Sequence, residues 1–567
     1  MLHLANEKFL AKVLAFGSAF IALFVITGTV TDPVNVTKHF ALGGVAAAAI
    51  AIAIAFGSKA LWQEHKTEVI FAVLFLLASI NAIINSSGPL VQNLYGVYGR
   101  NTAFVAYFLL LLVFISSLLL RSPNSFDLLI WGLLTAGFVN VLYSGWALMF
   151  GDFIPWNNPY GNILGTFGNP NFIGAFFGFF AAALVAFAFK KSWKIWQRVA
   201  AIIVFGITCV EIVLSNAIQG RVVVAAGIAI VGFYLIRSYF KSNIFSFGYV
   251  ILVGIMGVFA LLGALQKGPL AQYIYKTSVS LRGEYWQAGW NMTAGHQWTG
   301  VGFDTYGDWY RRARDTQALI LPGPNVTTNT AHNVPIDILA TGGWPLFIPY
   351  IAFIVLAIIA IIKVTLRNRD FDPTFVALTT AWAGFQLQSI ISINQIGLAV
   401  WGWLFTGALI AYERATRKTT PIENSEVKPK GRARVKSQAS GVVSPQIVAL
   451  IGAVVGLIIA CPPYSADSKW RQALTSNNAL KVEEALVPSY LNPLNSYKLA
   501  SASQLLEGSK LYDLAHKYAL KAVEFNPNHF ESWRLLYVIT NSTAEEKAKA
   551  LENMKRLDPN NPNPLSA

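Results

Sequence analysis

The chain has 567 residues, of which 54% are hydrophobic and only 13% are charged, and it carries a net charge of +15. This composition is typical of a polytopic membrane protein and argues against a soluble one. The basic residues cluster in short segments between apolar runs, as a membrane-topology signal does, and this argues against nucleic-acid binding.

Apolar stretches long enough to cross a hydrocarbon core of roughly 30 Å recur along the chain. The candidates are 10–30, 40–57, 69–85, 102–120, 126–150, 171–189, 198–215, 221–237, 246–265, 345–363, 373–392, 395–412 and 446–461. The first begins beside Lys8 and Lys12 and lacks a cleavage site, so we interpret it as a retained helix. We predict an all-α fold, a polytopic transmembrane bundle of about 12–13 helices, the division within 373–412 being the open point.

Basic residues are unevenly distributed between the two sides of the predicted helices. With the N-terminus in the cytoplasm, the cytoplasmic segments collect most lysines and arginines, whereas the short loops of the other side hold only Lys38, Arg100 and Arg221. The positive-inside rule therefore predicts this orientation. It places the polar segment 266–345 on the extracytoplasmic side as a large loop between two apolar spans.

These patterns divide the chain into parts. They are a transmembrane core (1–412), a basic linker (413–444), a last transmembrane helix (446–461) and a soluble extracytoplasmic tail (465–567). The linker is rich in Lys, Arg, Pro and Ser and has no apolar periodicity. It is interpreted either as a disordered cytoplasmic tether on anionic lipid or as a plain topology determinant.

The tail has the spacing of a helical repeat. Pro493, Pro527 and Pro559 each follow Asn or Asp and lie 34 and 32 residues apart. The paired helical patterns between them are typical of tetratricopeptide repeats. The alternative is a generic pair of helical hairpins. Either module could recruit a protein partner or only pack on the large loop.

The motifs give no support for metal or cofactor chemistry. Cys209 and Cys461 lack metal-ligand or CxxC spacing. Asp304 and Asp308 are not in DxD spacing, and no HExxH, GxSxG or phosphate-loop motif is present. We therefore predict no metal and no cofactor.

Arginines on the extracytoplasmic side are candidates for binding an anion. Arg100 precedes the fourth span, Arg221 lies at the mouth of the eighth, and Arg282 begins the polar part of the large loop. Guanidinium groups bind phosphate oxygens through two parallel hydrogen bonds, as the diphosphate of a lipid carrier requires. Each alone could instead reach a lipid headgroup.

His332 is the candidate proton acceptor. It lies just before Pro335, which suits the first turn of a helix, and Gly342-Gly343 suit the end of that helix. A neutral imidazole at a helix mouth can accept a proton from a sugar hydroxyl. The alternative is a histidine with a structural role only.

Aromatic side chains are frequent in the large loop, among them Tyr285, Trp286 and Trp290. They could stack on sugar rings or form an interfacial belt at the headgroup level, and the sequence favours neither. Glu284, Tyr285, Trp286 and Asn333 are the substrate-binding candidates beside Arg282 and His332.

Several stretches, in order, resemble the O-antigen ligase/polymerase superfamily. They are GTFGNPNFIGAFF (165–177), Gly220-Arg221, RGEYWQAGW with GVGFDTY, His-Asn followed by two glycines, and the ending 388–409. The resemblance covers roughly residues 60–412. It implies a metal-independent, inverting, GT-C-like glycosyltransferase of the bacterial cytoplasmic (inner) membrane. Its donor would be a polyprenyl-diphosphate-linked glycan, used on the extracytoplasmic face.

The resemblance also implies residue roles. Arg221 and Arg282 match the donor-phosphate arginines of the family, and His332 matches the histidine that activates the acceptor hydroxyl. Arg100 matches less closely, as a further phosphate contact. Here the glycine pair follows His-Asn after eight residues, with Trp-Pro beyond, which leaves the start of the next span open.

The predicted function is transfer of this glycan to an acceptor hydroxyl, on a glycan, a lipid or a protein. Ligase, polysaccharide polymerase and protein O-oligosaccharyltransferase are the competing activities within the family. A lipid or polysaccharide transporter is the alternative from another class, but it predicts internal repeats and buried charge in the spans, where Glu211 is the clearest acid.

Overall fold

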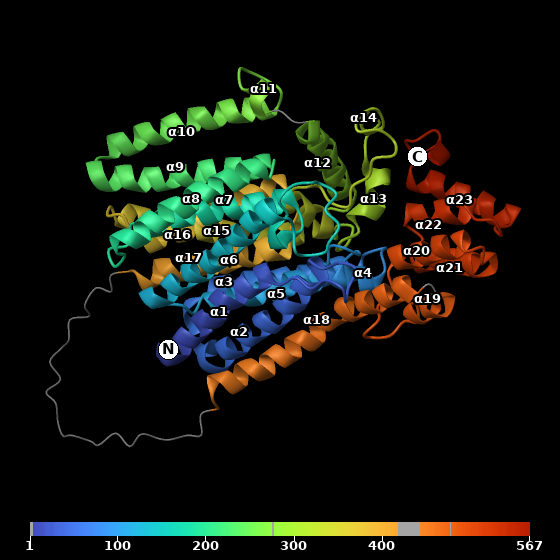
Figure 1. The fold of residues 1–567 in the computed structure, drawn as a ribbon, viewed down its shortest axis with the longest axis horizontal. Helices are drawn as coiled ribbons and strands as arrows, with labels where there is room; N and C mark the ends of the chain where they lie inside the picture. The colour runs from blue at the N-terminus through green and yellow to red at the C-terminus, as the bar shows by residue number, and fades with distance from the viewer. Residues whose placement is uncertain (1–3, 275–276, 418–442, 477, 567) are drawn as a thin grey trace.

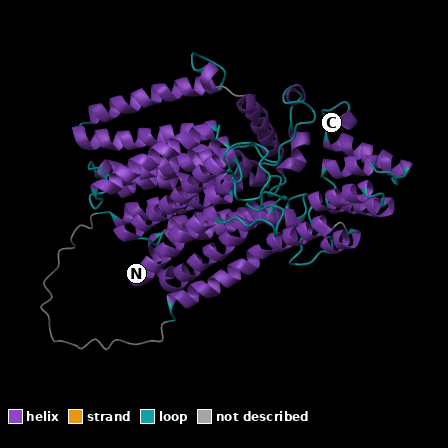
Figure 2. Ribbon diagram, viewed as in Figure 1, coloured by secondary structure: helices purple, strands orange, loops and turns teal. Residues whose placement is uncertain are grey.

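The structure is a computed structural model that describes residues 4–274, 277–417, 443–476 and 478–566. Within these ranges the chain forms helices joined by loops, without a β-strand (Figure 2). Ten of the described helices are long and apolar enough to cross a membrane. The predicted fold class, an all-α polytopic helix bundle, is confirmed.

Each of the predicted spans corresponds to a helix, although the helix in the first span ends at Leu23. The helices are α1 (Leu4–Leu23), α2 (Asn35–Glu64), α3 (Lys66–Ile84), α5 (Phe104–Ser117), α6 (Pro123–Phe150), α7 (Pro170–Ala188), α8 (Ile195–Leu214), α9 (Ile218–Phe240), α10 (Asn243–Ala264), α15 (Val334–Arg367), α16 (Pro373–Ile391), α17 (Ile396–Ala415) and α18 (Pro445–Ser476). Three of them are not among the ten. The first, α1, carries Glu7, Lys8 and Lys12, α5 is only 14 residues long, and α16 is diluted by polar residues such as Gln388.

The long helices lie side by side, and their connections gather at two ends (Figure 1). One end carries the N-terminus and the two segments that flank 418–442, the part of the predicted linker that lies outside the described residues. The opposite end, called the loop end below, carries the large loop and the tail. Its short helices are α4 (Leu90–Tyr95), α11 (Ala271–Ile274), α12 (Thr277–Gly295), α13 (Tyr306–Ala313) and α14 (Gln317–Ile320).

The interior of the bundle is built on α17 and its neighbours. Every residue in the apolar window of α17 is buried, whereas only 6% of the window of α10 is. Helix α10 therefore lies at the edge of the bundle, where an apolar surface suits contact with lipid (Figure 1). Lys38, predicted to lie in an outer loop, is instead a buried residue of α2, and its Nζ donates to the carbonyl of Ala22 at the end of α1.

Helices α2 and α18 approach each other through glycines. Gly43 and Gly456 face one another, and a Cβ on either residue would overlap the carbonyl oxygen of the other. Gly452 lies in the same way against the carbonyl of Ala47. Small residues at such a seam let helix backbones pack closely in lipid. This glycine seam holds α18 against the bundle.

Helix α18 is longer than the predicted last span. It continues through Pro462 and Pro463 and ends at Ser476. In this extension Asp467 accepts hydrogen bonds from the backbone N–H groups of Thr31 and Asp32, at 2.8 and 2.9 Å. The extension therefore fixes the connection between α1 and α2.

The tail follows α18 directly. Its helices are α19 (Ala479–Ala485), α20 (Ser496–Gly508), α21 (Tyr512–Phe525), α22 (Phe530–Val538) and α23 (Ala544–Leu557). The pairs α20–α21 and α22–α23 lie where the sequence predicts helical hairpins. Their assignment as tetratricopeptide repeats stays a prediction.

Helix α15 is interrupted near its start. Gly343 has a φ of 62°, outside the helical range, and the helix resumes at once and runs to Arg367. The sequence analysis predicts that the helix ends at this glycine pair. The large loop supplies partners for the interrupted backbone: Trp344 N–H donates to the carbonyl of Gln297, and the carbonyl of Ala340 accepts from Val301 N–H, both at 2.9 Å.

Candidate functional site

The large loop is fixed to the loop end by hydrogen bonds with the segment around α4. Asn93 Oδ1 accepts from the backbone N–H of Phe303 at 2.8 Å, and Gln92 Nε2 donates to the carbonyl of Asp304 at 2.9 Å. Gly302 has a φ of +106° and passes so close to Ser86 that a Cβ would overlap its side chain. The GVGFDTY stretch is thus a glycine turn that sets the position of α13.

Helix α12 and the mouth of α15 bring two predicted site residues together. Arg282 lies one turn before Tyr285 on α12, and the ring centroids of Tyr285 and His332 are 5.7 Å apart. His332 immediately precedes the helix cap of α15 and has a φ of +54°, which is uncommon for a residue with a side chain. Its backbone N–H donates to Thr330 Oγ1 at 3.2 Å. The imidazole is therefore held in a constrained turn beside α12.

Two arginines act electrostatically on His332. Burial lowers the pKa of the imidazole, and the positive charges of Arg100 and Arg282 lower it further, to about 4. Above this pH the imidazole is neutral and can accept a proton. The structure thus brings Arg100, Arg282 and His332, which are far apart in the sequence, into one electrostatic cluster.

Arg100 differs from Arg282 in its acidic neighbours. Burial lowers the pKa of the Arg100 guanidinium, and the carboxylates of Asp304 and Asp337 oppose this change. Asp304 is itself held in place, because its Oδ2 accepts from Val97 N–H at 2.8 Å. Part of the charge of Arg100 is therefore already balanced within the protein, and Arg282 is the stronger candidate for an incoming anion.

Arg221 makes its hydrogen bond to helix α8. It is in the first turn of α9 with an exposed side chain, and its Nη2 donates to the carbonyl of Val213 on α8 at 3.3 Å. Across the described part of the chain, no hydrogen bond or ion pair joins it to Arg282 or His332. The preceding Gly220 allows α9 to pack on Gly174 of α7 at close range.

The remaining predicted residues lie around the cluster. Asn333 caps α15, since its Oδ1 accepts from Ile336 N–H at 3.0 Å. Glu284 is half-buried on α12, where burial, and then the nearby Asp315, raise the pKa of its carboxyl. The indole Nε1 of Trp286 is buried without a hydrogen-bond partner. Tyr285 and Trp286 pack in the small core of the large loop. These contacts account for Tyr285 and Trp286, whereas Trp290 is 52% exposed and both predicted roles stay open for it.

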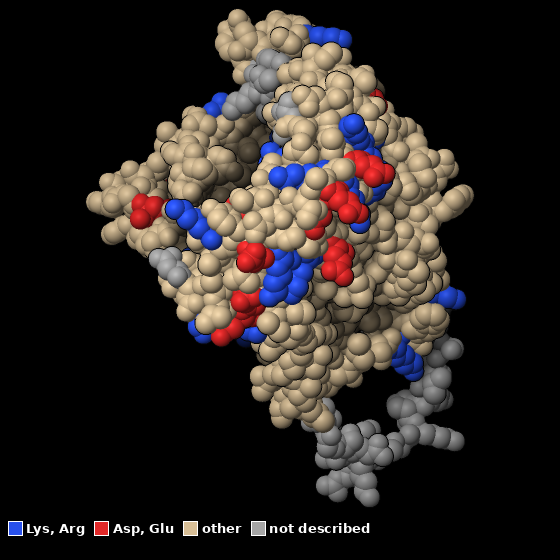
Figure 3. Space-filling view, turned by 90° about the vertical axis from the view of Figure 1, so that its right-hand side faces the viewer, with Lys and Arg blue, Asp and Glu red and all other residues tan. Residues whose placement is uncertain are grey.

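The loop end is hollowed when seen end-on (Figure 3). Lysine and arginine side chains lie at the margin of the hollow, and acidic side chains are grouped on the protein surface beside it (Figure 3). Basic side chains therefore border a hollow on the same side of the molecule as the loops and the tail.

The sequence analysis missed Asp337. Its Oδ1 accepts from the backbone N–H of Ala331 at 2.6 Å, and its charge acts on Arg100. The residue thus ties the turn that carries His332 to the first turn of α15. An acidic residue two positions after Pro335 was the available signal, since carboxylates favour the first turn of a helix.

Across the described residues, no group of three or more His, Cys, Asp or Glu side chains is placed to hold a metal ion. Catalysis without a metal stays a prediction.

Comparison with known proteins identifies a segment of the chain. Residues 172–351 match the family model described as O-Antigen ligase. The matched segment runs from α7 into α15 and includes Arg221, Arg282 and His332, but neither Arg100 nor the tail. No curated protein matches the chain.

Proposed function

Since its segment 172–351 makes this chain a member of the O-antigen ligase superfamily, we propose that it transfers a glycan from a polyprenyl diphosphate to an acceptor hydroxyl. The proposed location is a bacterial cytoplasmic membrane, with the loop end and the tail outside. The predicted donor carries its diphosphate at the membrane surface, where a basic cluster at the ends of spanning helices can reach it.

One observation carries this proposal: Arg282 and His332 lie together at the loop end. A glycosyl transfer from a diphosphate needs positive charge on the leaving group and a group that removes the acceptor proton. Arg282 and the neutral His332 provide these two functions from α12 and from the mouth of α15. Arg100 adds a second positive charge that acts on His332.

The proposed step runs as a single displacement. The acceptor hydroxyl attacks the anomeric carbon, while the bond between that carbon and the diphosphate oxygen breaks. His332 takes the hydroxyl proton, and Arg282 stabilises the departing diphosphate. Attack opposite the leaving group inverts the anomeric centre. Arg221 is a further phosphate contact in this scheme if the donor extends to the mouth of α9.

Donor binding would also change the basicity of His332. In the free protein two positive charges disfavour a proton on the imidazole. A bound diphosphate brings negative charge between them, which raises the pKa of His332 and makes it a stronger base. The histidine would therefore become an effective base only when the donor is in place.

Reconstitution with a lipid-linked oligosaccharide tests the proposal. The change of Arg282→Ala or His332→Ala is expected to lower the release of polyprenyl diphosphate by at least about 100-fold, while the protein still inserts in the membrane. Arg534→Ala and His516→Ala, both in the tail, are matched controls and should retain activity. Full activity of both site variants would contradict the assignment.

The product distinguishes the competing activities. A ligase gives a glycan on a surface acceptor, a polymerase gives a longer lipid-linked chain, and a protein oligosaccharyltransferase gives a glycan on Ser or Thr. A transporter would instead move the glycan across the bilayer without breaking its bond to the diphosphate.

A further inference from the structure

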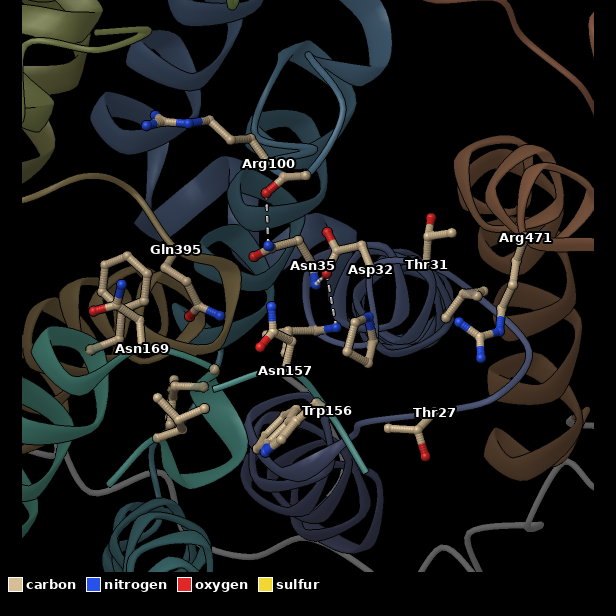
Figure 4. A pocket seen from close by; sticks show the side chains of 18 of the residues that line it. Thr27, Thr31, Asp32, Asn35, Arg100, Trp156, Asn157, Asn169, Gln395 and Arg471 are labelled. Atoms are coloured by element: carbon tan, nitrogen blue, oxygen red, sulfur yellow. Dashed lines mark hydrogen bonds between the residues drawn. The ribbon is translucent and has the colours of Figure 1, made fainter. Parts of the chain in front are cut away.

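A separate cavity of about 570 Å³ opens at the loop end beside Arg100. Its walls come from the connection between α1 and α2, the connection between α6 and α7, the turn between α16 and α17, and Arg471 of α18 (Figure 4). Most of these walls lie outside the segment that matches the family. The volume suits a ligand of one or two sugar rings.

Two residues that line this cavity each have a buried polar atom without a hydrogen-bond partner. Gln395 is 2% exposed, its Oε1 accepts from Leu398 N–H at 3.1 Å, and its Nε2 has no partner. In Figure 4 this amide nitrogen points toward the middle of the cavity. Asp32 Oδ2 is also buried without a partner. A buried donor and a buried acceptor without partners are costly unless a ligand satisfies them.

The rim of the cavity also carries an aromatic ring, that of Trp156. Trp156 is anchored by a hydrogen bond from its Nε1 to Asp152 Oδ2 at 2.7 Å, which leaves its ring to line the cavity (Figure 4). Asn157 beside it is exposed. Opposite, Arg471 Nε donates to the carbonyl of Gly28 at 2.8 Å, so that its guanidinium closes that side.

We propose that this cavity binds a neutral pyranose unit. A sugar has hydroxyls that donate to an oxygen such as Asp32 Oδ2 and accept from a nitrogen such as Gln395 Nε2, and an apolar face that packs on an indole ring. A phosphate offers mainly acceptors, so it would leave Asp32 Oδ2 without a donor. The mixed donors and acceptors therefore favour an uncharged sugar.

The cavity adjoins the cluster around His332. Arg100 lines it, while the side chain of this residue extends away from its centre and its charge acts on His332 (Figure 4). A glycan of several units can therefore have one unit in the cavity and another beside His332. That this unit belongs to a transferred or accepting glycan rests on the proposed function, whereas the binding itself does not.

Saturation-transfer NMR on the full-length protein in detergent tests the proposal without any donor. The probes are the methyl glycosides of glucose, galactose, rhamnose and N-acetylglucosamine, with inorganic pyrophosphate as the charged comparison. At least one glycoside should give a signal that falls fivefold or more in Gln395→Glu, which keeps the oxygen that caps α17 but replaces the donor nitrogen. Trp156→Ala and Asn157→Ala should weaken the same signal.

Matched controls separate binding from folding. Gln472→Glu, on the exposed side of α18, and Trp196→Ala, 63% exposed at the other end of the bundle, should keep the signal. The proposal is overturned if no glycoside gives a signal, if the cavity variants bind as the wild type does, or if only pyrophosphate binds. A protein that binds the glycoside but never releases polyprenyl diphosphate retains the cavity site and loses the proposed transferase function.

Discussion

The arginines of the large loop fall into two environments. Arg314 is 1% exposed and pairs with the fully buried Asp558 of the tail at 2.7 Å, and Arg311 shares the same carboxylate at 3.3 Å. Arg282 has no carboxylate within ion-pair distance among the described residues, and its electrostatic neighbours are Tyr285 and His332. Arg282 therefore keeps its charge available to an anionic ligand and is a candidate site residue. Arg311 and Arg314 instead connect the large loop to the tail, and their pairs with Asp558 are called the joint below.

Loss of the Asp558 carboxylate, which Arg311 and Arg314 share, should have the largest effect on the contact between the large loop and the tail. Asp558→Ala removes the carboxylate that pairs with the buried Arg314 and leaves Arg311 with Glu531 alone, which is expected to cost about 3–5 kcal/mol in docking of the tail on the large loop. Hydrogen exchange and limited proteolysis between residues 526 and 561 would measure the loosening.

The control for this change is Glu531→Ala. Glu531 also pairs with Arg311, but its side chain is 42% exposed, so the loss should be about 1 kcal/mol or less. Equal protection of the tail in Asp558→Ala and wild type would show that the buried pairs do not hold the tail.

The pH dependence of activity tests the role of Arg282 at the candidate site. His332 must be neutral to accept a proton, so activity should fall as pH decreases through its pKa, which is about 4 in the free protein. Arg282→Gln removes one of the charges that lower this pKa, and the acid limb of kcat/KM should therefore move to higher pH. In the wild type, the acid limb of kcat should lie above that of kcat/KM, because the bound diphosphate raises the pKa.

Arg314→Gln serves as the comparison variant and should leave the acid limb in place. If the acid limb of kcat/KM lies at the same pH in Arg282→Gln as in the wild type, Arg282 does not act on the pKa of His332.

A fourth arginine of the large loop, Arg312, should have the smallest effect when it is replaced. Arg312 lies over the ring of Trp309, 3.7 Å from its centroid, and its Nη2 donates to the carbonyl of Asp308. Arg312→Ala is expected to lower stability by about 0.5–1 kcal/mol and to change glycan transfer by less than about twofold. Thermal unfolding and the reconstituted assay measure these effects, and a loss as large as that of Arg282→Ala would remove the distinction between the two environments.

Hydropathy was sufficient to predict the bundle. Each predicted span corresponds to a helix, because length and apolar composition are local properties set by the bilayer. The end of α18 was predicted at residue 461 because its extension is polar, yet Asp467 and Trp470 are buried there against the α1–α2 connection and the tail. Hydropathy cannot detect burial that one part of a protein provides for another.

The site was predictable only in part, for a similar reason. Arg282 and His332 lie in recognisable stretches of one loop. The influence of Arg100 depends on the packing of α4 under that loop, and Asp558 lies more than two hundred residues from the arginines that it pairs with. No local pattern reports such pairs. Gln395 had no signal at all, since its free Nε2 is evident only from the surrounding structure.

The glycine seam between α2 and α18 also bears on the order in which the protein is made. The ribosome completes the other spanning helices before it reaches α18, so the cavity wall that Arg471 provides is the last to arrive. Until Gly456 meets Gly43, the connection between α1 and α2 lacks its hydrogen bonds to Asp467, and the cavity beside Arg100 has one side open. Completion of this cavity is thus coupled to the final step of membrane assembly. A chain that stalls before α18 has the cluster of Arg100, Arg282 and His332 but not the neighbouring cavity.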